Sequence, residues 1–205
     1  MTPFTHLTAI AAPIDEPNVD TNQLCPTRFN KVPRGPQYAK ILFHDRRFYA
    51  DGSEKEHVLN AEPYNRAQII VADRNWGSGS SRESAVYALY EFGVRCVIAS
   101  SFGDIHANNC YKNGLLPVVL SEAECAALRA QLRDSPGTTI SVDLSVQTVT
   151  DAQGRTYRFD IHPVRKQCLM AGLDDIARTE QYRREMNAFE AAYQNEQPWL
   201  YGKRI

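Results

Sequence analysis

From Gln68 onward, short apolar runs alternate with polar segments of helix length. The run 69–72 is apolar at every position, as expected of a strand that is buried on both faces. Because strands that alternate with helices build parallel or mixed sheets, we expect an α/β fold with a mixed sheet core flanked by helices. The predicted strands are 69–72, 94–99 and 115–120, and the predicted helices are 81–92, 104–113 and 121–132. Ser121 and Glu124 form a capping-box pattern at the start of the third helix.

The segments on either side of this alternation follow different patterns. The first 60 residues contain frequent prolines, which disfavour helices, so we expect short strands and long loops there. After Pro136 and Gly137 the sequence predicts strands at 139–144, 146–150 and 156–161. Two helices, about 164–171 and 174–194, close the chain, and the second carries an apolar stripe. We expect one domain over residues 1–205, with a C-terminal helical extension from about 162 to 205.

Composition narrows the class of protein. The formal net charge of -1 argues against a nucleic-acid surface or a basic membrane patch. The sequence contains no apolar run near the ~20 residues that a membrane span needs, and its start lacks the pattern of a signal peptide. The five cysteines are scattered, which fits free thiols in a reducing compartment and fails the spacing of metal sites. We therefore expect a cytoplasmic protein that binds no metal itself.

The most informative motif is W-G-S-G-S-S-R-E-S at positions 76–84, between a predicted buried strand and a predicted helix. Gly77 and Gly79 allow the backbone to approach a ligand closely, and Arg82 supplies a guanidinium group suited to a carboxylate or phosphate. Helix-start amides favour a negative group at such a place. Ser80 and Glu83 also match a capping box, which is the purely structural alternative. The motif lacks the G-K-[ST] ending of a nucleotide loop and the G-x-S-x-G spacing of a hydrolase.

Positions 77–83 resemble the swivelling-domain signature of the aconitase superfamily, which usually reads G-x-G-S-S-R-E-H. The superfamily pattern is also similar at 18–21, 58–60, 101–105, 113–117 and 172–176. In order and spacing these segments resemble the small subunits of bacterial 3-isopropylmalate dehydratases along nearly the whole chain. The resemblance implies a swivelling β/β/α domain.

The resemblance also implies a function. The chain would be the small subunit of a heteromeric hydro-lyase that interconverts 2- and 3-isopropylmalate in leucine biosynthesis. The partner, a large subunit, would hold a [4Fe-4S] cluster, and the substrate would be a small hydroxy acid. Ser80 would be the catalytic base, and Ser81 and Arg82 would bind a substrate carboxylate. Gly79, Asn22 and Arg28 complete the candidate substrate-binding residues.

Three positions depart from the family pattern. Asn22 stands where the family usually has Asp, Ser84 replaces the usual His, and Arg46 replaces an aromatic residue. These changes leave open a related substrate, citraconate or 2-methylmalate, or a non-catalytic homologue. In the loop 25–38, Phe29 and Val32, with Leu24 just before it, suit an apolar substrate side chain. Arg28 and Arg34 suit a charged one.

Overall fold

The computed structural model describes residues 1–79 and 81–202. It divides the chain into two compact units, Met1–Gly172 and Leu173–Ile205. The first unit includes the helix α7 (Pro163–Ala171), whose Leu169 is buried in the core. That the chain forms one domain with a helical extension from about residue 162 stays a prediction.

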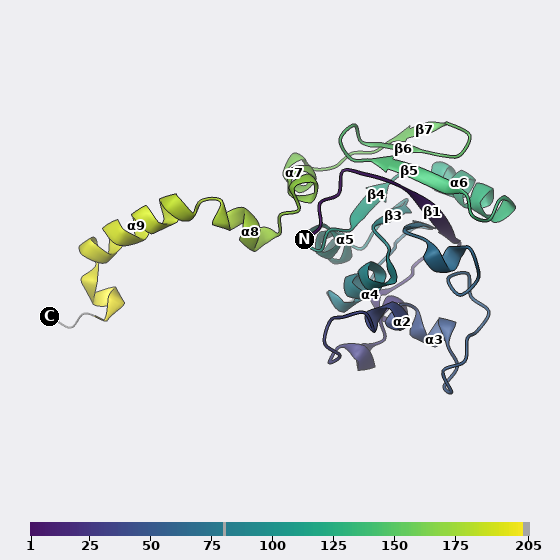
Figure 1. The fold of residues 1–205 in the computed structure, drawn as a ribbon, viewed down its shortest axis with the longest axis horizontal. Helices are drawn as coiled ribbons and strands as arrows, with labels where there is room; N and C mark the ends of the chain where they lie inside the picture. The colour runs from purple at the N-terminus through teal and green to yellow at the C-terminus, as the bar shows by residue number, and fades with distance from the viewer. Residues whose placement is uncertain (80, 203–205) are drawn as a thin grey trace. The chain divides into compact units, whose positions relative to one another are not determined.

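The first unit is built on a seven-stranded mixed sheet of order β4-β3-β2-β1-β5-β6-β7 among the described residues (Figure 1). Its strands are β1 His6–Ile14, β2 Ile69–Ala72, β3 Cys96–Ala99, β4 Leu116–Val119, β5 Thr139–Asp143, β6 Thr148–Thr150 and β7 Thr156–Arg158. β1 to β4 pair in parallel, whereas β1, β5, β6 and β7 pair antiparallel. The predicted α/β fold with a mixed sheet is confirmed.

Helices cover both faces of this sheet. Consecutive strand residues point to opposite sides, so each face presents its own apolar side chains to a layer of helices. Ile70 of β2 belongs to a core cluster with α2 and α4, whereas Ile69 belongs to a second cluster with α6 and α7. The other helices of the first unit are α1 Thr21–Leu24, α2 Tyr38–Ile41, α3 His44–Arg47, α4 Ser84–Phe92, α5 Asp104–Lys112 and α6 Glu122–Asp134, with 3₁₀ turns at Thr27–Phe29 and Tyr64–Arg66. The capping box predicted for α6 is present, since the hydroxyl of Ser121 accepts from the amide of Glu124.

Some predicted boundaries were wrong. The N-terminal region contains one nine-residue strand, β1, and three short helices instead of short strands and loops. Pro13 is tolerated within β1 because the pairing with β5 ends at Ile10, so its missing N–H costs no bond to that strand. α4 begins at Ser84, three residues later than predicted, because Arg82 and Ser81 remain non-helical.

The second unit contains α8 (Asp175–Glu180), α9 (Arg183–Glu196) and a 3₁₀ turn at Pro198–Tyr201. The single helix predicted over 174–194 is therefore two helices, interrupted at Tyr182, whose backbone is non-helical. The predicted apolar stripe is present on α9 but is exposed to solvent. Phe189, for example, is 68% exposed. Among the described helices, none combines the length and the apolar character that crossing a membrane requires.

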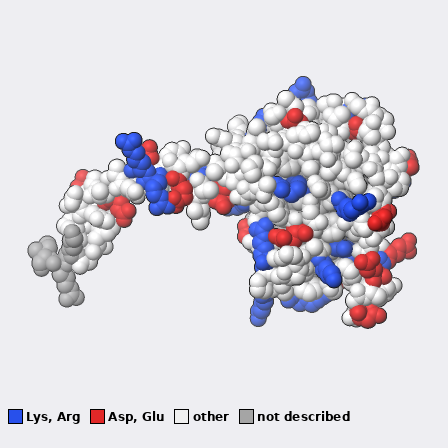
Figure 2. Space-filling model, in the orientation of Figure 1, with Lys and Arg blue, Asp and Glu red and all other residues white. Residues whose placement is uncertain are grey.

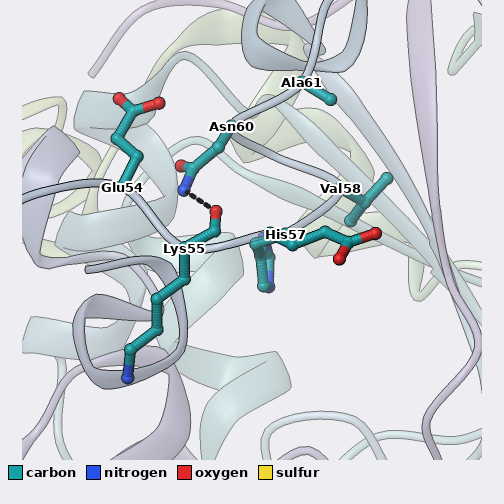
Figure 3. A pocket seen from close by; sticks show the side chains of 7 residues that line it. Glu54, Lys55, His57, Val58, Asn60 and Ala61 are labelled. Carbon is teal, nitrogen blue, oxygen red and sulfur yellow. Dashed lines mark hydrogen bonds between the residues drawn. The ribbon is translucent and has the colours of Figure 1, made fainter. Parts of the chain in front are cut away.

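The segment 58–60, one of the family landmarks, has a structural role. Leu59 is fully buried, and Asn60 holds Arg47 by accepting from its Nε at 2.8 Å and donating to its carbonyl at 2.8 Å. Asn60 Nδ2 also donates to the carbonyl of Lys55 at 3.0 Å. Figure 3 shows this bond in the wall of a surface hollow of about 600 Å³. Asn60 thereby provides the acceptor for Nε of the buried Arg47, whose Nη1 donates to the carbonyls of Ala39 and Leu42.

We expect Asn60→Ala to lower the free energy of unfolding by roughly 1–3 kcal/mol, because it leaves a buried guanidinium N–H without its acceptor. Urea denaturation measures the change. Asn65→Ala is the matched control, since Asn65 is exposed and lies in the following 3₁₀ turn. Equal losses in the two variants would contradict the role assigned to Asn60.

Candidate active site

Three loops meet at the carboxyl ends of the parallel strands β1, β2 and β3. The loop after β2 lies against the loop after β1, and two backbone hydrogen bonds join them. The amide of Gly77 donates to the carbonyl of Val19 at 2.7 Å, and the amide of Thr21 donates to the carbonyl of Ser78 at 3.0 Å. It is joined to the loop after β3 by the amide of Trp76, which donates to the carbonyl of Ser101 at 3.0 Å. The motif at 76–84 thus lies at the sheet edge where α/β proteins commonly bind ligands.

Gly77 is required by its surroundings. Its φ is +70°, and a Cβ atom built there would lie 2.1 Å from the Cδ2 atom of His106 on α5. His106 is only 2% exposed, so it has little room to move. The histidine ring therefore packs directly against the backbone of Gly77 and supports the loop, and only glycine fits at position 77. Gly79 also has a positive φ, +94°, but more space around it.

Arg82 is held by two side chains from the N-terminal segment. Its Nη2 donates to Oδ1 of Asn22 at 2.6 Å, and its Nη1 donates to Oγ1 of Thr27 at 2.7 Å. The hydroxyl of Thr27 in turn donates to Oδ1 of Asn22 at 2.7 Å. We call these three residues the Arg82 cluster. The structure therefore brings together Asn22 and Arg82, both predicted from sequence, with Thr27, which was not.

Sequence patterns carried no signal for Thr27. It is 55 residues from Arg82 and begins the 3₁₀ turn Thr27–Phe29, directly after Pro26. The pairing of β1 with β2 and the backbone bonds between the loops that follow them bring these segments together.

The residue that replaces the family's histidine lies beside this cluster. Ser84, predicted to lie on the first turn of the helix, is the first residue of α4 and is buried. Its Oγ donates to Oδ1 of Asn30 at 2.9 Å. Burial raises the pKa of the nearby Cys25 thiol, although a hydrogen bond with Ser84 and the charge of Arg82 oppose this rise. Cys25 thus remains a protonated thiol at neutral pH.

Arg28 is engaged outside the Arg82 cluster. Its guanidinium forms a two-point ion pair with the carboxylate of Asp45 and also contacts His44. Its hydrogen bond, and to a lesser extent that of His44, lowers the pKa of the Asp45 carboxyl to about 2. Arg46, the extra cation expected near the site, pairs instead with Glu16. The structure does not place these two arginines against Arg82.

The remaining predicted site residues are Ser80 and Ser81. Ser80 lies outside the described residues. Ser81 is exposed, and its carbonyl accepts a long bond, 3.5 Å, from Nδ2 of Asn109. Glu83 occupies the cap position of α4 without a side-chain capping bond and instead accepts from the hydroxyl of Tyr87 at 2.8 Å. Because α4 begins at Ser84, Glu83 is its N-cap and not the third helical residue of a capping box that starts at Ser80.

The described residues of this chain do not suit a metal or cluster. No group of three or more His, Cys, Asp or Glu side chains within residues 1–79 and 81–202 is arranged to hold a metal ion. Cys25, Cys96, Cys110 and Cys125 are buried free thiols, and burial raises the pKa of each. The thiolate form that binds iron or zinc is therefore disfavoured.

The Arg82 cluster is suited to binding an anion. It presents a guanidinium group, partly exposed, on a loop fixed by backbone bonds to two neighbouring loops. A fixed guanidinium group recognises a carboxylate through paired hydrogen bonds.

Comparisons with known proteins agree with this reading. Residues 1–123 match the family described as the Aconitase C-terminal domain, and residues 126–163 match the family LeuD_N. A solved structure described as 3-isopropylmalate dehydratase (leuD) from Methanocaldococcus jannaschii has a TM-score of 0.63 at 21% identity, covering 90% of this chain and 99% of that chain. The fold is thus that of an aconitase C-terminal domain.

Closer relatives refine the family. Proteins named 3-isopropylmalate dehydratase small subunit from Roseobacter denitrificans and Caulobacter vibrioides are 43% and 45% identical. Each match covers 98% of this chain, and covers 100% and 99% of the relative. A protein of the same name from Gluconacetobacter diazotrophicus is 45% identical over 97% of both chains. The chain belongs to the family of 3-isopropylmalate dehydratase small subunits, which confirms the resemblance drawn from the motifs.

We expect Gly77→Ala to lower the free energy of unfolding by roughly 2–5 kcal/mol, from backbone strain together with overlap with His106. Gly154→Ala is the control, because Gly154 also has a positive φ but no atom within 4 Å of its built Cβ. Its expected loss is about 1–2 kcal/mol. Chemical denaturation of both variants measures the difference, and a loss at Gly77 no greater than at Gly154 would refute the support by His106.

Burial lowers the pKa of His106 to about 4, below its ordinary value of 6.5. A histidine with a depressed pKa stabilises the fold fully above pH 6.5 and loses that contribution as the pH falls toward 4. Relative to His106→Gln, the wild type should lose roughly 2 kcal/mol between pH 7 and pH 5. Urea unfolding at both pH values tests this. An equal change in the free energy of unfolding of the two proteins between pH 7 and pH 5 would contradict it.

Proposed function

We propose that this chain is the small subunit of a two-chain hydro-lyase that interconverts 2-isopropylmalate and 3-isopropylmalate by dehydration and rehydration, in leucine biosynthesis. It would be active only with its large subunit. The observation that carries the proposal is the Arg82 cluster, in a chain whose named relatives match it at 43–45% identity along their whole length.

The role of each residue follows from its chemistry. Arg82 would bind and orient a substrate carboxylate, with Ser81 and the backbone at Gly79 beside it. Ser80 would take the proton from the carbon next to that carboxylate, and the neighbouring carbon would lose its hydroxyl. A serine is a poor base unless its alkoxide is stabilised, and a guanidinium in the same loop is suited to that. Rehydration reverses these transfers with the hydroxyl on the other carbon.

The partner would supply the metal chemistry. The family resemblance assigns a [4Fe-4S] cluster to the large subunit, and the described residues of this chain offer it no ligand set. The proposed location is the cytoplasm, with which five free cysteines agree. On the face drawn in Figure 2, charges of both signs are interspersed, which suits a small-molecule enzyme more than a nucleic-acid binder.

The loop 25–38 favours an apolar substrate side chain. Arg28 is paired with Asp45, and Arg34 is paired with Glu91 and lies over the ring of Tyr87. The two arginines that could serve a charged side chain therefore already have partners, whereas Lys31 of the same loop is exposed. Phe29 and Val32 are partly exposed, whereas Leu24 is fully buried and belongs to the core. We therefore favour isopropylmalate over a substrate that carries an additional charge.

The test is anaerobic reconstitution with the large subunit, followed by assays on isopropylmalate, citraconate and 2-methylmalate. Ser80→Ala and Arg82→Ala should each lower turnover of isopropylmalate roughly 100- to 1000-fold without loss of complex assembly, because each removes a preorganised group. Arg66→Ala, at an exposed position in a 3₁₀ turn, is the control and should retain activity. Wild-type activity in Arg82→Ala would overturn the assignment. If the wild-type complex turned over none of the three acids, that result would favour a non-catalytic homologue.

A further inference from the structure

Two residues in the loops of the candidate site have left-handed backbone although they are not glycines. Asn18, in the loop after β1, has a φ of +59°, and Asn75, in the loop after β2, has a φ of +57°. In the part of the chain that the structure describes, Phe43 and Gln147 are the other residues of this kind. Left-handed backbone strains a residue that has a side chain, and strained residues cluster at functional sites. The pair therefore points to a role in the site.

The two asparagine side chains bind each other. Nδ2 of Asn75 donates to Oδ1 of Asn18 at 2.8 Å, across 57 residues of sequence. A backbone bond accompanies this one, since the amide of Asn18 donates to the carbonyl of Arg74 at 2.9 Å. A side-chain bond and a backbone bond therefore join the loops after β1 and β2 just before the motif at 76–84.

Asn75 also holds the loop after β3. Its amide donates to Oγ of Ser101 at 2.8 Å, and the next amide, that of Trp76, donates to the carbonyl of the same serine. The amide of Gly103 donates in return to the carbonyl of Trp76 at 2.8 Å. Asn75 thus bonds to the loops on both sides of its own, to one through its side chain and to the other through its backbone. We call Asn18, Asn75 and Ser101 the three-loop link.

The three-loop link lies at the surface. Asn18 and Ser101 are exposed, and Asn75 is partly exposed. Because an exposed hydrogen bond contributes little net free energy to folding, the bond between the asparagines is a small part of the stability of the fold. Its consequence is geometric, since it fixes the start of the segment that carries Arg82.

We propose that Asn75 is a positioning residue of the hydro-lyase, and that its bond to Asn18 sets the place of the motif at 76–84 against the loops on either side. The inference rests on the proposed function and makes it more specific. Neither asparagine touches the substrate in this account. The link keeps the catalytic residues of the motif in place, and a displacement of about 1 Å in such a segment can lower a rate roughly 100-fold.

The competing explanation is conformational only. Asparagine tolerates left-handed backbone better than most residues, so the turns alone would account for Asn18 and Asn75. Glycine separates the two explanations, because it adopts left-handed backbone without strain and has no side chain to form the bond. If only the turns matter, Asn18→Gly and Asn75→Gly match the wild type in activity. If the bond matters, both variants lose activity while the fold keeps its stability, since relief of strain offsets the lost bond.

The experiment measures kcat and KM of the reconstituted complex for 3-isopropylmalate, and the urea midpoint of each variant chain. We expect Asn18→Gly and Asn75→Gly each to lower kcat roughly 10- to 100-fold, with KM within about threefold of the wild type. The urea midpoint should stay within about 0.5 M of the wild-type value. A kcat of Asn75→Gly equal to that of the wild type overturns the proposal.

Three further variants make the test specific to the bond. The double variant Asn18→Gly/Asn75→Gly should be no slower than either single variant, because both changes remove the same bond. Asn18→Asp keeps an acceptor for Nδ2 of Asn75, so its kcat should stay within about threefold of the wild type. Gln147→Gly, at a left-handed residue in the turn between β5 and β6, is the control and should keep the wild-type kcat. Losses that multiply in the double variant would contradict the shared bond.

A second measurement does not depend on turnover. Hydrogen exchange of the full chain alone, followed by NMR, reports how often the amides of Trp76, Gly77 and Gly103 lose their bonds to the neighbouring loops. Asn75→Gly should speed exchange of these amides at least about fivefold, whereas Gln147→Gly should not. If the wild-type complex is inactive but exchange speeds up in this way, the proposed function fails and the link stands. If the complex is active and neither kcat nor exchange changes in Asn75→Gly, the link fails.

Discussion

The parallel pairing of β1 with β2 and of β2 with β3 is the constraint on which the site depends. Parallel strands place their carboxyl ends at one edge, so three loops that are distant in sequence leave the sheet side by side. Backbone bonds from Gly77 to Val19 and from Trp76 to Ser101 then fix these loops to one another. The side chains on them are positioned by the sheet, with His106 of α5 supporting the central loop from beneath.

This arrangement explains how a flexible side chain becomes a fixed receptor. An arginine loses considerable rotamer entropy when it is held in one geometry. Here Asn22 and Thr27 hold Arg82 before any ligand arrives, so binding an acid costs less ordering. The guanidinium N–H groups that these bonds leave free suit a carboxylate and disfavour a cation.

The division of labour with a partner also follows from the chemistry of the chain. The buried cysteines stabilise the core as apolar side chains, and the described residues offer no ligand set for a metal. The chain carries a guanidinium and hydroxyl groups, which under the proposed function would bind an organic acid and take up its proton. Loss of a hydroxyl group from the substrate needs chemistry that these groups do not supply. Because relatives of this chain are named small subunits, we assign that chemistry to a second chain.

Local patterns predicted the parts of the fold that depend on local physics. The run 69–72 forms β2, and the pattern Ser121 to Glu124 forms the capping box of α6, because burial and capping act within a few residues. Local patterns could not place the start of α4, which lies after Arg82, a residue whose side chain bonds to Asn22 and Thr27 far away in the sequence. Thr27 was missed for the same reason, since its role depends on a partner 55 residues away. Arg28 was predicted as a substrate ligand, but the sequence could not show its pairing with Asp45.

The central claim is that this chain contributes the Arg82 cluster to an active site completed by a larger subunit. The most direct test is an experimental structure of the reconstituted complex with 3-isopropylmalate bound. We predict one substrate carboxylate within hydrogen-bonding distance of the Arg82 guanidinium. A substrate whose carboxylates are bound by the large subunit alone, with Arg82 facing solvent, would contradict it.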